Sequence, residues 1–277
     1  MTRIRMFATD LDGTLLRSDG TISPRTAAAM AAAREAGVEV VWATARARHS
    51  VRALAATCGF RGKAVCANGA VIVDLATGEP EIVETVTIDA DHARTAMAHL
   101  RELVPGVAFA NVGATEFVAE AEYVAMCDFT DHHRHPHDMT VSTVLPVANH
   151  PLVKIVARHA DVPSADLFTL VSGAGIAGVE VTHSGAPYVE MAAAGVSKAS
   201  ALERVCQRLG IDATEVAAAG DAFNDVAMLT WAGTAVVPAN ARPEVRALAA
   251  LVIPANDEDG VAQYLEQLIA EQAASRT

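Results

Sequence analysis

Two aspartates one residue apart, Asp10 and Asp12, follow a short apolar run that ends at Thr9. Acidic residues are poor strand formers, so this D-x-D-G pattern predicts a buried strand that ends in two carboxylates. In parallel α/β sheets, ligands bind at the carboxyl edge of the strands. Two like charges this close are costly unless a cation or a phosphoryl transfer uses them. Taken alone, the pair is equally consistent with solvated aspartates at an ordinary strand exit.

Polar side chains stand at three further predicted junctions between strands and helices: Thr44, Lys198 and the loop 220–225, which reads G-D-A-F-N-D. Each has a simpler structural explanation, because Thr44 and the loop can cap helices and Lys198 can lie solvated in a first helical turn. Together with Asp10 and Asp12 they offer what phosphoryl transfer needs. One carboxylate can attack phosphorus and form an aspartyl-phosphate, and a second can act as acid and then as base. Helix-start amides and a lysine can hold phosphoryl oxygens, and carboxylate oxygens suit Mg²⁺.

The elements that must position these groups alternate between strands and helices. Ser23 and Pro24 predict the start of a helix that Gly37 ends. Buried-type strands are predicted at residues 38–43, 63–67, 215–219, 235–237 and 251–253, a hairpin at 71–73 and 82–83, and further helices before Gly59, at 198–209, after Pro243 and up to residue 270. This order is typical of a parallel sheet with covering helices, so the predicted fold class is α/β with a Rossmann-like core.

The middle of the chain has a different pattern, with more predicted strands than crossover helices. Helices are predicted at 89–103 and 164–171, strands at 107–110, 115–119, 152–157 and 178–182, and an irregular His-rich segment at 127–137. This indicates an antiparallel α+β insert. We therefore expect two domains, a core built from residues 1–84 and 193–277 and a cap built from residues 85–192.

Composition limits the classes of partner that the protein is expected to bind and the compartment in which it is expected to lie. The formal net charge of −12 over 277 residues argues against a surface built for nucleic acid or for an anionic membrane. Four cysteines without paired spacing indicate buried free thiols in a reducing compartment. No signal-peptide pattern precedes Asp10, and no run approaches the roughly 18 apolar residues of a membrane span. We expect a cytoplasmic protein, monomeric or homodimeric.

The four junctions together resemble a known set of motifs. Asp10-Leu11-Asp12-Gly13-Thr14, Thr44, Gly195-Val196-Ser197-Lys198 and Gly220-Asp221-Ala222-Phe223-Asn224-Asp225 are similar, in order and spacing, to the four motifs of the haloacid dehalogenase (HAD) superfamily. The chain looks most like the Cof-type phosphatases, which insert a large α/β cap (class IIB) between the second and third motifs. The resemblance implies Mg²⁺-dependent hydrolysis of a small phosphorylated metabolite, such as a sugar phosphate or a nucleotide-related phosphate. A phosphomutase or phosphotransferase acting on a sugar phosphate, and a non-catalytic ligand-binding relative, are the alternatives.

The resemblance also implies roles for individual residues. Asp10 would be the nucleophile and Asp12 the general acid and base. Mg²⁺ would be bound by the Asp10 side chain, the Asp12 main-chain carbonyl and Asp221. Asp225 would support the metal site without binding the ion directly. The phosphoryl group would be held by Thr44, Lys198 and the amides of Leu11 and Ala45, with Asn224 beside it.

The second motif departs from that pattern, because it reads Thr44-Ala45-Arg46 where close relatives have Thr-Gly-Arg. Alanine keeps the amide but loses easy access to positive φ, and we expect activity to survive. We expect Arg46 to begin a helix near the cap. There it would meet the substrate or a cap carboxylate, or lie on the plain surface.

The cap is expected to set specificity, because the core handles only the phosphoryl group. Asn68-Gly69 resembles the turn that relatives place at the mouth of the site, facing the cap. Lys154 on a cap strand either reaches an anionic substrate or lies solvated. The segment 131–138 carries metal-ligand types in Asp131, His132, His133, His135 and His137. Pro136 and the lack of a helical His pair backed by a carboxylate favour a flexible loop near the substrate over a second metal site.

Overall fold

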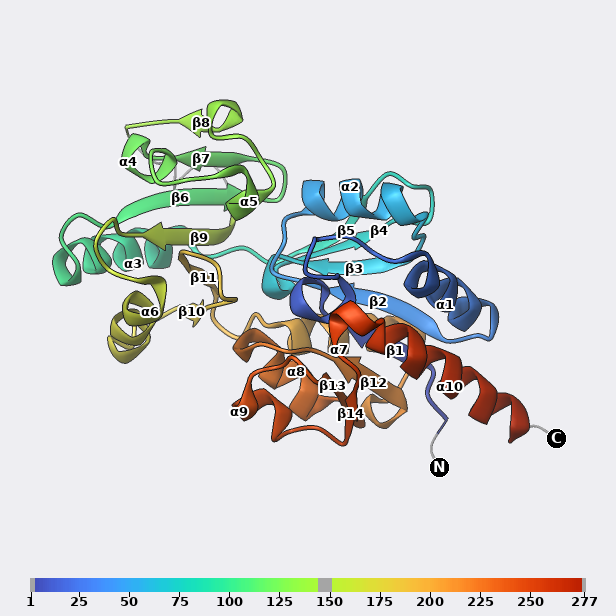
Figure 1. The fold of residues 1–277 in the computed structure, drawn as a ribbon. Coiled ribbons are helices and arrows are strands. Elements are labelled where there is room, and N and C mark those ends of the chain that lie inside the picture. Colours follow the sequence, from blue (N-terminus) through green and yellow to red (C-terminus); the bar gives the residue numbers. More distant parts are fainter. Residues whose placement is uncertain (1–2, 144–150, 276–277) are drawn as a thin grey trace.

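The computed structural model describes residues 3–143 and 151–275, which form two β-sheets with helices packed on them (Figure 1). The core sheet has the order β14-β13-β12-β1-β2-β3-β4-β5. Its strands are β1 Met6–Thr9, β2 Glu39–Ala43, β3 Lys63–Cys66, β4 Val71–Asp74, β5 Glu81–Thr85, β12 Val216–Ala219, β13 Thr234–Pro238 and β14 Leu251–Ile253. The strands from β14 to β3 run parallel, and β4 and β5 add an antiparallel hairpin. The prediction of an α/β core is confirmed.

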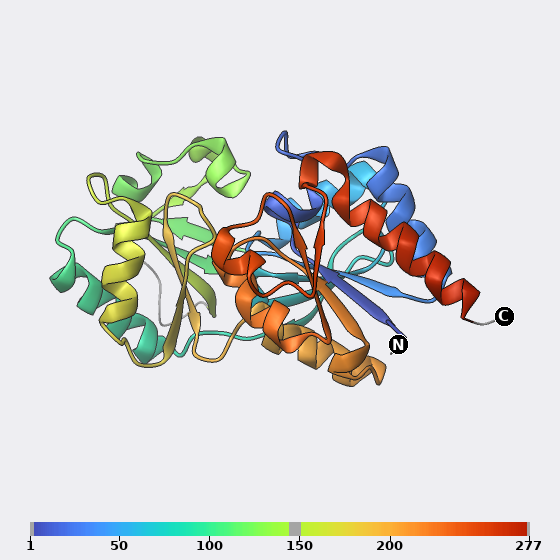
Figure 2. The ribbon, with the colours of Figure 1, turned by 60° about the horizontal axis from the view of Figure 1, so that its bottom comes forward.

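Helices cover both faces of the core sheet (Figures 1 and 2). Helices α1 Pro24–Glu35, α2 Arg48–Cys58 and α10 Gly260–Ala274 lie on one face, and α7 Lys198–Leu209, α8 Val226–Trp231 and α9 Pro243–Arg246 on the other. Successive residues of a strand point to opposite faces, so Phe7 and Trp42 pack towards the first group and Ala8 and Val41 towards the second. Burying a large side chain such as that of Phe7 contributes about 1.5–3 kcal/mol.

The cap sheet has the order β10-β11-β9-β6-β7-β8 and is antiparallel except for the pairing of β7 with β8. Its strands are β6 Ala108–Gly113, β7 Phe117–Ala119, β8 Thr140–Val141, β9 Leu152–Arg158, β10 Val179–Thr182 and β11 Val189–Ala193. Helices α3 Ala90–Leu103 and α6 Ser164–Gly173 cover the face that is turned away from the core (Figures 1 and 2). Short helices α4 Ala121–Val124 and α5 Phe129–His132 connect β7 to β8.

Local signals explain the helix ends that matter for the site. The Ser197 side chain accepts from Ser200 N and so caps α7, which begins at Lys198. Gly59 and Gly210 end α2 and α7 in the left-handed conformation.

Two strands were not predicted, β8 and β11, and both lie in the cap. The apolar run V-E-M-A-A that forms β11 is interrupted by Glu190, and β8 has only two residues. The segment 127–137, expected to be irregular, contains α5 and enters a single 3₁₀ turn, Pro136–Asp138. Helix α2 begins at Arg48 and not at Arg46, because Ala47 is still extended.

The cysteines are free, as expected, but Cys58 is only partly buried, whereas Cys66, Cys127 and Cys206 are buried. Among the described residues, no helix combines the length and the apolar character that a bilayer crossing requires.

Candidate active site

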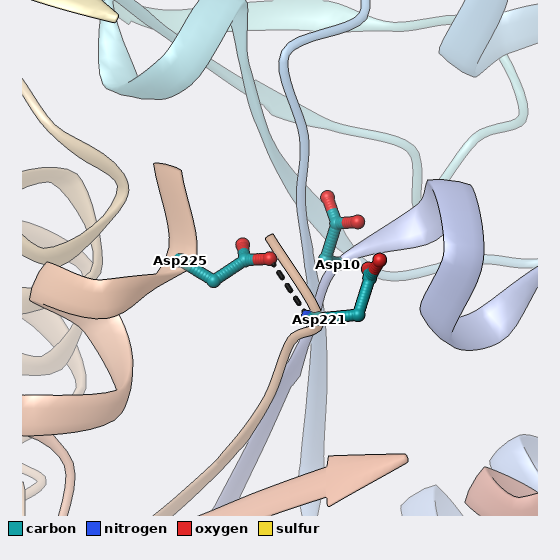
Figure 3. Close-up of side chains that lie close together, drawn as sticks. All are labelled: Asp10, Asp221 and Asp225. Atoms are coloured by element: carbon teal, nitrogen blue, oxygen red, sulfur yellow. Dashed lines mark hydrogen bonds between the residues drawn. The ribbon is translucent and has the colours of Figure 1, made fainter. Parts of the chain in front are cut away.

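Three carboxylates meet at the carboxyl edge of the core sheet (Figure 3). Strands β1 and β12 are parallel neighbours, with Thr9 opposite Ala219, so the residues that follow them emerge side by side. Asp10 follows β1, and its amide donates to the Ala219 carbonyl at 2.9 Å. The loop after β12 brings Asp221 and Asp225 beside it, and oxygens of the three carboxylates lie within 4.8 Å of one another.

Lys198 completes this cluster from the first turn of α7. Its side chain is fully buried, and Nζ donates to Asp10 Oδ1 at 2.5 Å and to Asp225 Oδ1 at 2.7 Å. The turn at Gly69 packs against the start of α7, where a Cβ on Gly69 would lie 2.2 Å from the Ser197 carbonyl oxygen. Gly69 also has φ +113°, so glycine is required here both for space and for backbone conformation.

The cluster is short of positive charge. Burial first, and then the neighbouring carboxylates, hold the pKa of Asp10 well above its usual range although Lys198 opposes them. Burial and the Asp225 charge raise the pKa of Asp221 to about 6. One lysine therefore does not balance three buried or half-buried carboxylates. The all-oxygen donor set fits a hard divalent cation.

Asp225 is satisfied entirely by the protein. Its Oδ1 accepts from Lys198, and its Oδ2 accepts from the Asp221 amide (Figure 3) and from the Ala222 amide, each at 3.0 Å. It therefore orients the loop that carries Asp221. Asp221 in turn accepts from Thr14 Oγ1 at 2.7 Å, and a Cβ on Gly13 would lie 2.5 Å from Asp221 Oδ2.

Asp12 lies apart from the cluster, at the edge of a cavity. Its side chain is 57% exposed, against 7% for Asp10. Arg46 binds it with two hydrogen bonds, Nε to Oδ2 at 2.7 Å and Nη2 to Oδ1 at 2.5 Å. Arg46 therefore meets a core carboxylate, and the expectations of a cap carboxylate or of a plain surface position are wrong.

The second motif forms a tight turn. Thr44 is fully buried, and its Oγ1 accepts from Arg46 N at 3.0 Å, so the hydroxyl caps this turn and not helix α2. The non-glycine residues with positive φ in the described chain are Ala67, Asn68, His133 and Asp259. Ala45 is not among them, so alanine causes no backbone strain there.

A cavity of about 230 Å³ lies between Asp10 and the cap. Of the predicted residues, it is lined by Asp10, Asp12, Ala45, Arg46, Asn224, Lys154, Asp131, His132 and His133. The other predicted residues of the site do not line it: Leu11, Thr44, Lys198, Asp221, Asp225, Asn68 and Gly69.

Aromatic residues of the cap that were not predicted form one wall of this cavity. The His132 ring stacks on Tyr188 with centroids 4.7 Å apart and lies 4.9 Å from Phe117. Its backbone carbonyl accepts from His49 Nε2 of α2 at 3.0 Å, which joins the cap to the core. Burial first, and then the Lys154 charge, lower the pKa of His132 to about 3, so the ring is neutral.

The side chains of the His-rich segment 131–138 contact several different neighbours. Within the described residues, which include 131–138, the group of potential ligands is the cluster of Asp10, Asp221 and Asp225. His135 and His137 stack on each other at the surface, and Asp131 pairs with Arg158 at 2.7 Å. Asp131, His132 and His133 line the cavity, and contact of this segment with substrate stays a prediction.

Lys154 is neither solvated nor a free cation. It is buried, and its Nζ donates to Glu190 Oε1 at 2.6 Å and to the Ala45 carbonyl at 3.2 Å. Glu190 was missed in the sequence. The signal was present, since L-V-K-I-V and Y-V-E-M-A are apolar runs that each carry one charge, and the two charges are opposite.

Comparisons with known proteins place phosphatases among the relatives of this chain. The chain is 29% identical over 269 residues to the 5-amino-6-(5-phospho-D-ribitylamino)uracil phosphatase YcsE of Bacillus subtilis, with 96% of each chain covered. It is 28% identical over 285 residues to the pyridoxal phosphate phosphatase YbhA of Escherichia coli, with 94% of this chain and 97% of that protein covered.

The fold is shared as well. A solved haloacid dehalogenase-like hydrolase from B. subtilis superposes with a TM-score of 0.79 at 25% identity, covering 95% of this chain and 99% of that one. A family model described as haloacid dehalogenase-like hydrolase matches residues 7–265. The resemblance seen in the motifs is confirmed, and the chain belongs to the haloacid dehalogenase-like hydrolases.

Proposed function

We propose that this protein is a Mg²⁺-dependent phosphatase that releases inorganic phosphate from a small phosphorylated metabolite. The observation that carries the proposal is the position of Asp10. Its carboxylate lies in an acidic cluster, 2.5 Å from a buried lysine, and lines a cavity that the cap closes. The residues 85–192 act in this proposal as a cap domain over the core formed by 1–84 and 193–277.

Mg²⁺ would be held by the Asp10 side chain, the Asp12 main-chain carbonyl and Asp221. Asp225 would support it by orienting the Asp221 loop through two amide hydrogen bonds. The bound ion would supply positive charge to the cluster and to the phosphoryl oxygens.

The reaction would proceed in two displacements. Asp10 attacks phosphorus, the bond from phosphorus to the ester oxygen breaks, and Asp12 donates its proton to the departing oxygen. This leaves an aspartyl-phosphate on Asp10. Asp12 then takes a proton from water, which attacks phosphorus and releases phosphate while the Asp10 carboxylate is restored. The separate, more exposed position of Asp12 supports this division of roles.

The remaining groups would hold the phosphoryl group between these steps. Lys198 already contacts Asp10 and would place positive charge next to the transferred group. The amides of Leu11 and Ala45, the Thr44 hydroxyl and Asn224 would complete its surroundings. Ala45 and Asn224 line the cavity itself.

The substrate is expected to be small. Pockets for drug-sized ligands measure about 300–1,000 Å³, and this cavity of about 230 Å³ must also receive the phosphoryl group. A sugar phosphate or a nucleotide-related phosphate of similar size suits it. The two curated relatives are named for phosphates of single-ring compounds, which supports the same size class.

The decisive experiment is a phosphate-release assay of purified protein with Mg²⁺, p-nitrophenyl phosphate and a panel of phosphorylated metabolites. We expect Asp10→Asn to abolish release while circular dichroism and the thermal midpoint show an intact fold. Asp166→Asn, an exposed aspartate on the outer face of the cap, is the matched control and should retain activity. Full activity of Asp10→Asn, or no release from any substrate, contradicts the proposal. Release that depends on a bisphosphate activator would instead indicate a phosphomutase.

A further inference from the structure

The cap sheet buries two opposite charges on the face that is turned towards the core. Lys154 of β9 is 5% exposed and Glu190 of β11 is 1% exposed, and Nζ lies 2.6 Å from Oε1. The pairing of Ile155 with Met191 makes them diagonal neighbours on this face. A buried ion pair is often no more stabilising than an apolar pair of the same size. Stability alone therefore does not account for it.

Both members of the pair also bind the core. Lys154 Nζ donates to the Ala45 carbonyl at 3.2 Å, and Glu190 Oε2 accepts from Asn68 Nδ2 at 3.1 Å. Asn68 Oδ1 in turn accepts from Asn224 Nδ2 at 3.1 Å. The pair is thus the centre of a hydrogen-bond network that joins two cap strands to the second and fourth motifs.

The two ends of this network are groups at the phosphoryl position. Ala45 and Asn224 both line the cavity beside Asp10. The peptide between Ala45 and Arg46 is held on both sides, because Lys154 binds its carbonyl and Thr44 Oγ1 binds its N–H. Its orientation therefore depends on a cap residue.

The backbone at Asn68 is a second, independent sign of this dependence. Ala67 and Asn68 have φ +50° and +54°, and two successive non-glycine residues in this region are costly. Such conformations persist where the surroundings fix them. The Asn68 side chain is fixed by Glu190 and Asn224 and also by Thr182 Oγ1 of the cap, at 3.2 Å.

We propose that Lys154 and Glu190 are a positioning pair, through which the closed cap sets the Ala45 backbone and the Asn224 side chain around the transferred phosphoryl group. The cap then contributes to phosphoryl binding whatever the leaving group is. This inference rests on the proposed function, since it assigns the phosphoryl position to the cavity beside Asp10.

The test uses Lys154→Met and Glu190→Gln in the full chain, with Mg²⁺ present. The readouts are kcat and KM for p-nitrophenyl phosphate and for the best metabolite, and the inhibition constant of inorganic phosphate. A displacement of about 1 Å at a reacting group can cost up to about 100-fold. We expect kcat/KM to fall at least about tenfold for both substrates. The inhibition constant of inorganic phosphate should rise as well. Phosphate has no leaving group, so its binding reports on the phosphoryl position alone.

Two further variants separate positioning from folding. Lys154→Met with Glu190→Leu removes both charges, so it should fold stably yet keep the kinetic defect. Arg101→Met breaks the cap pair with Glu120, neither of which lines the cavity, and should leave the phosphate constant unchanged.

The outcomes distinguish the possible failures. Normal kinetics and phosphate inhibition in the double variant would overturn the positioning role. A defect confined to the metabolite substrate, with phosphate inhibition unmoved, would show that Lys154 contacts the leaving group instead. If the unaltered protein hydrolyses nothing, the proposed function fails. Calorimetric titration with inorganic phosphate and Mg²⁺ then still decides whether the Lys154–Glu190 pair controls anion binding. Equal phosphate affinity of the unaltered protein and the double variant would refute the positioning role.

Discussion

Arg46 binds Asp12 through two parallel hydrogen bonds, at 2.7 Å from Nε and 2.5 Å from Nη2. The Arg46 side chain is only 11% exposed, although its carboxylate partner is largely exposed. The guanidinium also lies 3.3 Å from Ser50 Oγ on α2, so it is anchored to the core. The proposed acid and base is therefore held at the rim of the cavity by a rigid partner.

The first prediction concerns this anchor. Arg46→Lys keeps the charge but loses the planar pair of donors, and lysine does not replace arginine at such sites. We expect kcat to fall about tenfold, with a smaller change in KM, because Asp12 is no longer oriented. Steady-state assays with p-nitrophenyl phosphate measure this. Arg52→Lys, which alters an exposed pair with Glu79, is the control. Equal loss in both variants would argue against orientation of Asp12.

The second prediction concerns Gly69. Gly69→Ala places a Cβ 2.2 Å from the Ser197 carbonyl oxygen, so the turn or the start of α7 must shift. We expect lower stability, and also lower activity because Lys198 begins that helix. Gly20→Ala is a matched control, since Gly20 has φ +79° with no atom within 4 Å of its Cβ. Gly20→Ala should lower the free energy of unfolding only by the cost of a non-glycine residue at positive φ, about 1–2 kcal/mol. Chemical unfolding compares the two, and equal costs would contradict the packing argument.

Much of the site was predictable because its residues lie at the ends of elements. Asp10, Asp221 and Lys198 follow strands or begin helices, and parallel strands bring such positions to one edge. The role of Glu190 was not predictable in the same way, because it depends on contact with Lys154, which lies 36 residues away in sequence. A lone charge in an apolar run lowers the strand signal, and only the pairing of β9 with β11 explains it. The neutral, half-buried state of His132 likewise depends on its packing against Tyr188.

The third prediction concerns pH. The folded state holds His132 neutral down to a pKa of about 3, while an unfolded histidine titrates near 6.5. Between these values the unfolded state binds more protons, so stability is lost as pH falls below about 6.5. We expect His132→Gln to reduce this loss. Urea unfolding at pH 7.5 and pH 5 measures it, with His99→Gln on the exposed side of α3 as the control. The same pH dependence in both variants would assign the loss to other groups.

The fourth prediction concerns the metal. Burial and the Asp225 charge raise the pKa of Asp221 to about 6, so its charge is unfavourable without a cation. Asp221→Asn should therefore leave metal-free stability equal or higher, while removing the rise in thermal midpoint that Mg²⁺ gives the unaltered protein. That rise corresponds to about 2.7 kcal/mol at 100 times the dissociation constant. Asp212→Asn, at an exposed carboxylate bound to Thr214, should keep the Mg²⁺ effect. An unchanged Mg²⁺ response in Asp221→Asn would remove Asp221 from the metal site.

The fifth prediction separates the two displacements. Asp12→Ala removes the proposed acid and base but leaves Asp10, Lys198 and the acidic cluster in place. p-Nitrophenolate is a good leaving group that needs little protonation, so the phosphoryl group should still transfer to Asp10. Its hydrolysis lacks a base, and the phosphorylated protein should accumulate and persist. Intact-protein mass spectrometry after mixing detects it, and the Asp10→Asn, Asp12→Ala double variant should show none. Rapid turnover by Asp12→Ala would mean that another group activates the water, and His133, which also lines the cavity, is an alternative to test.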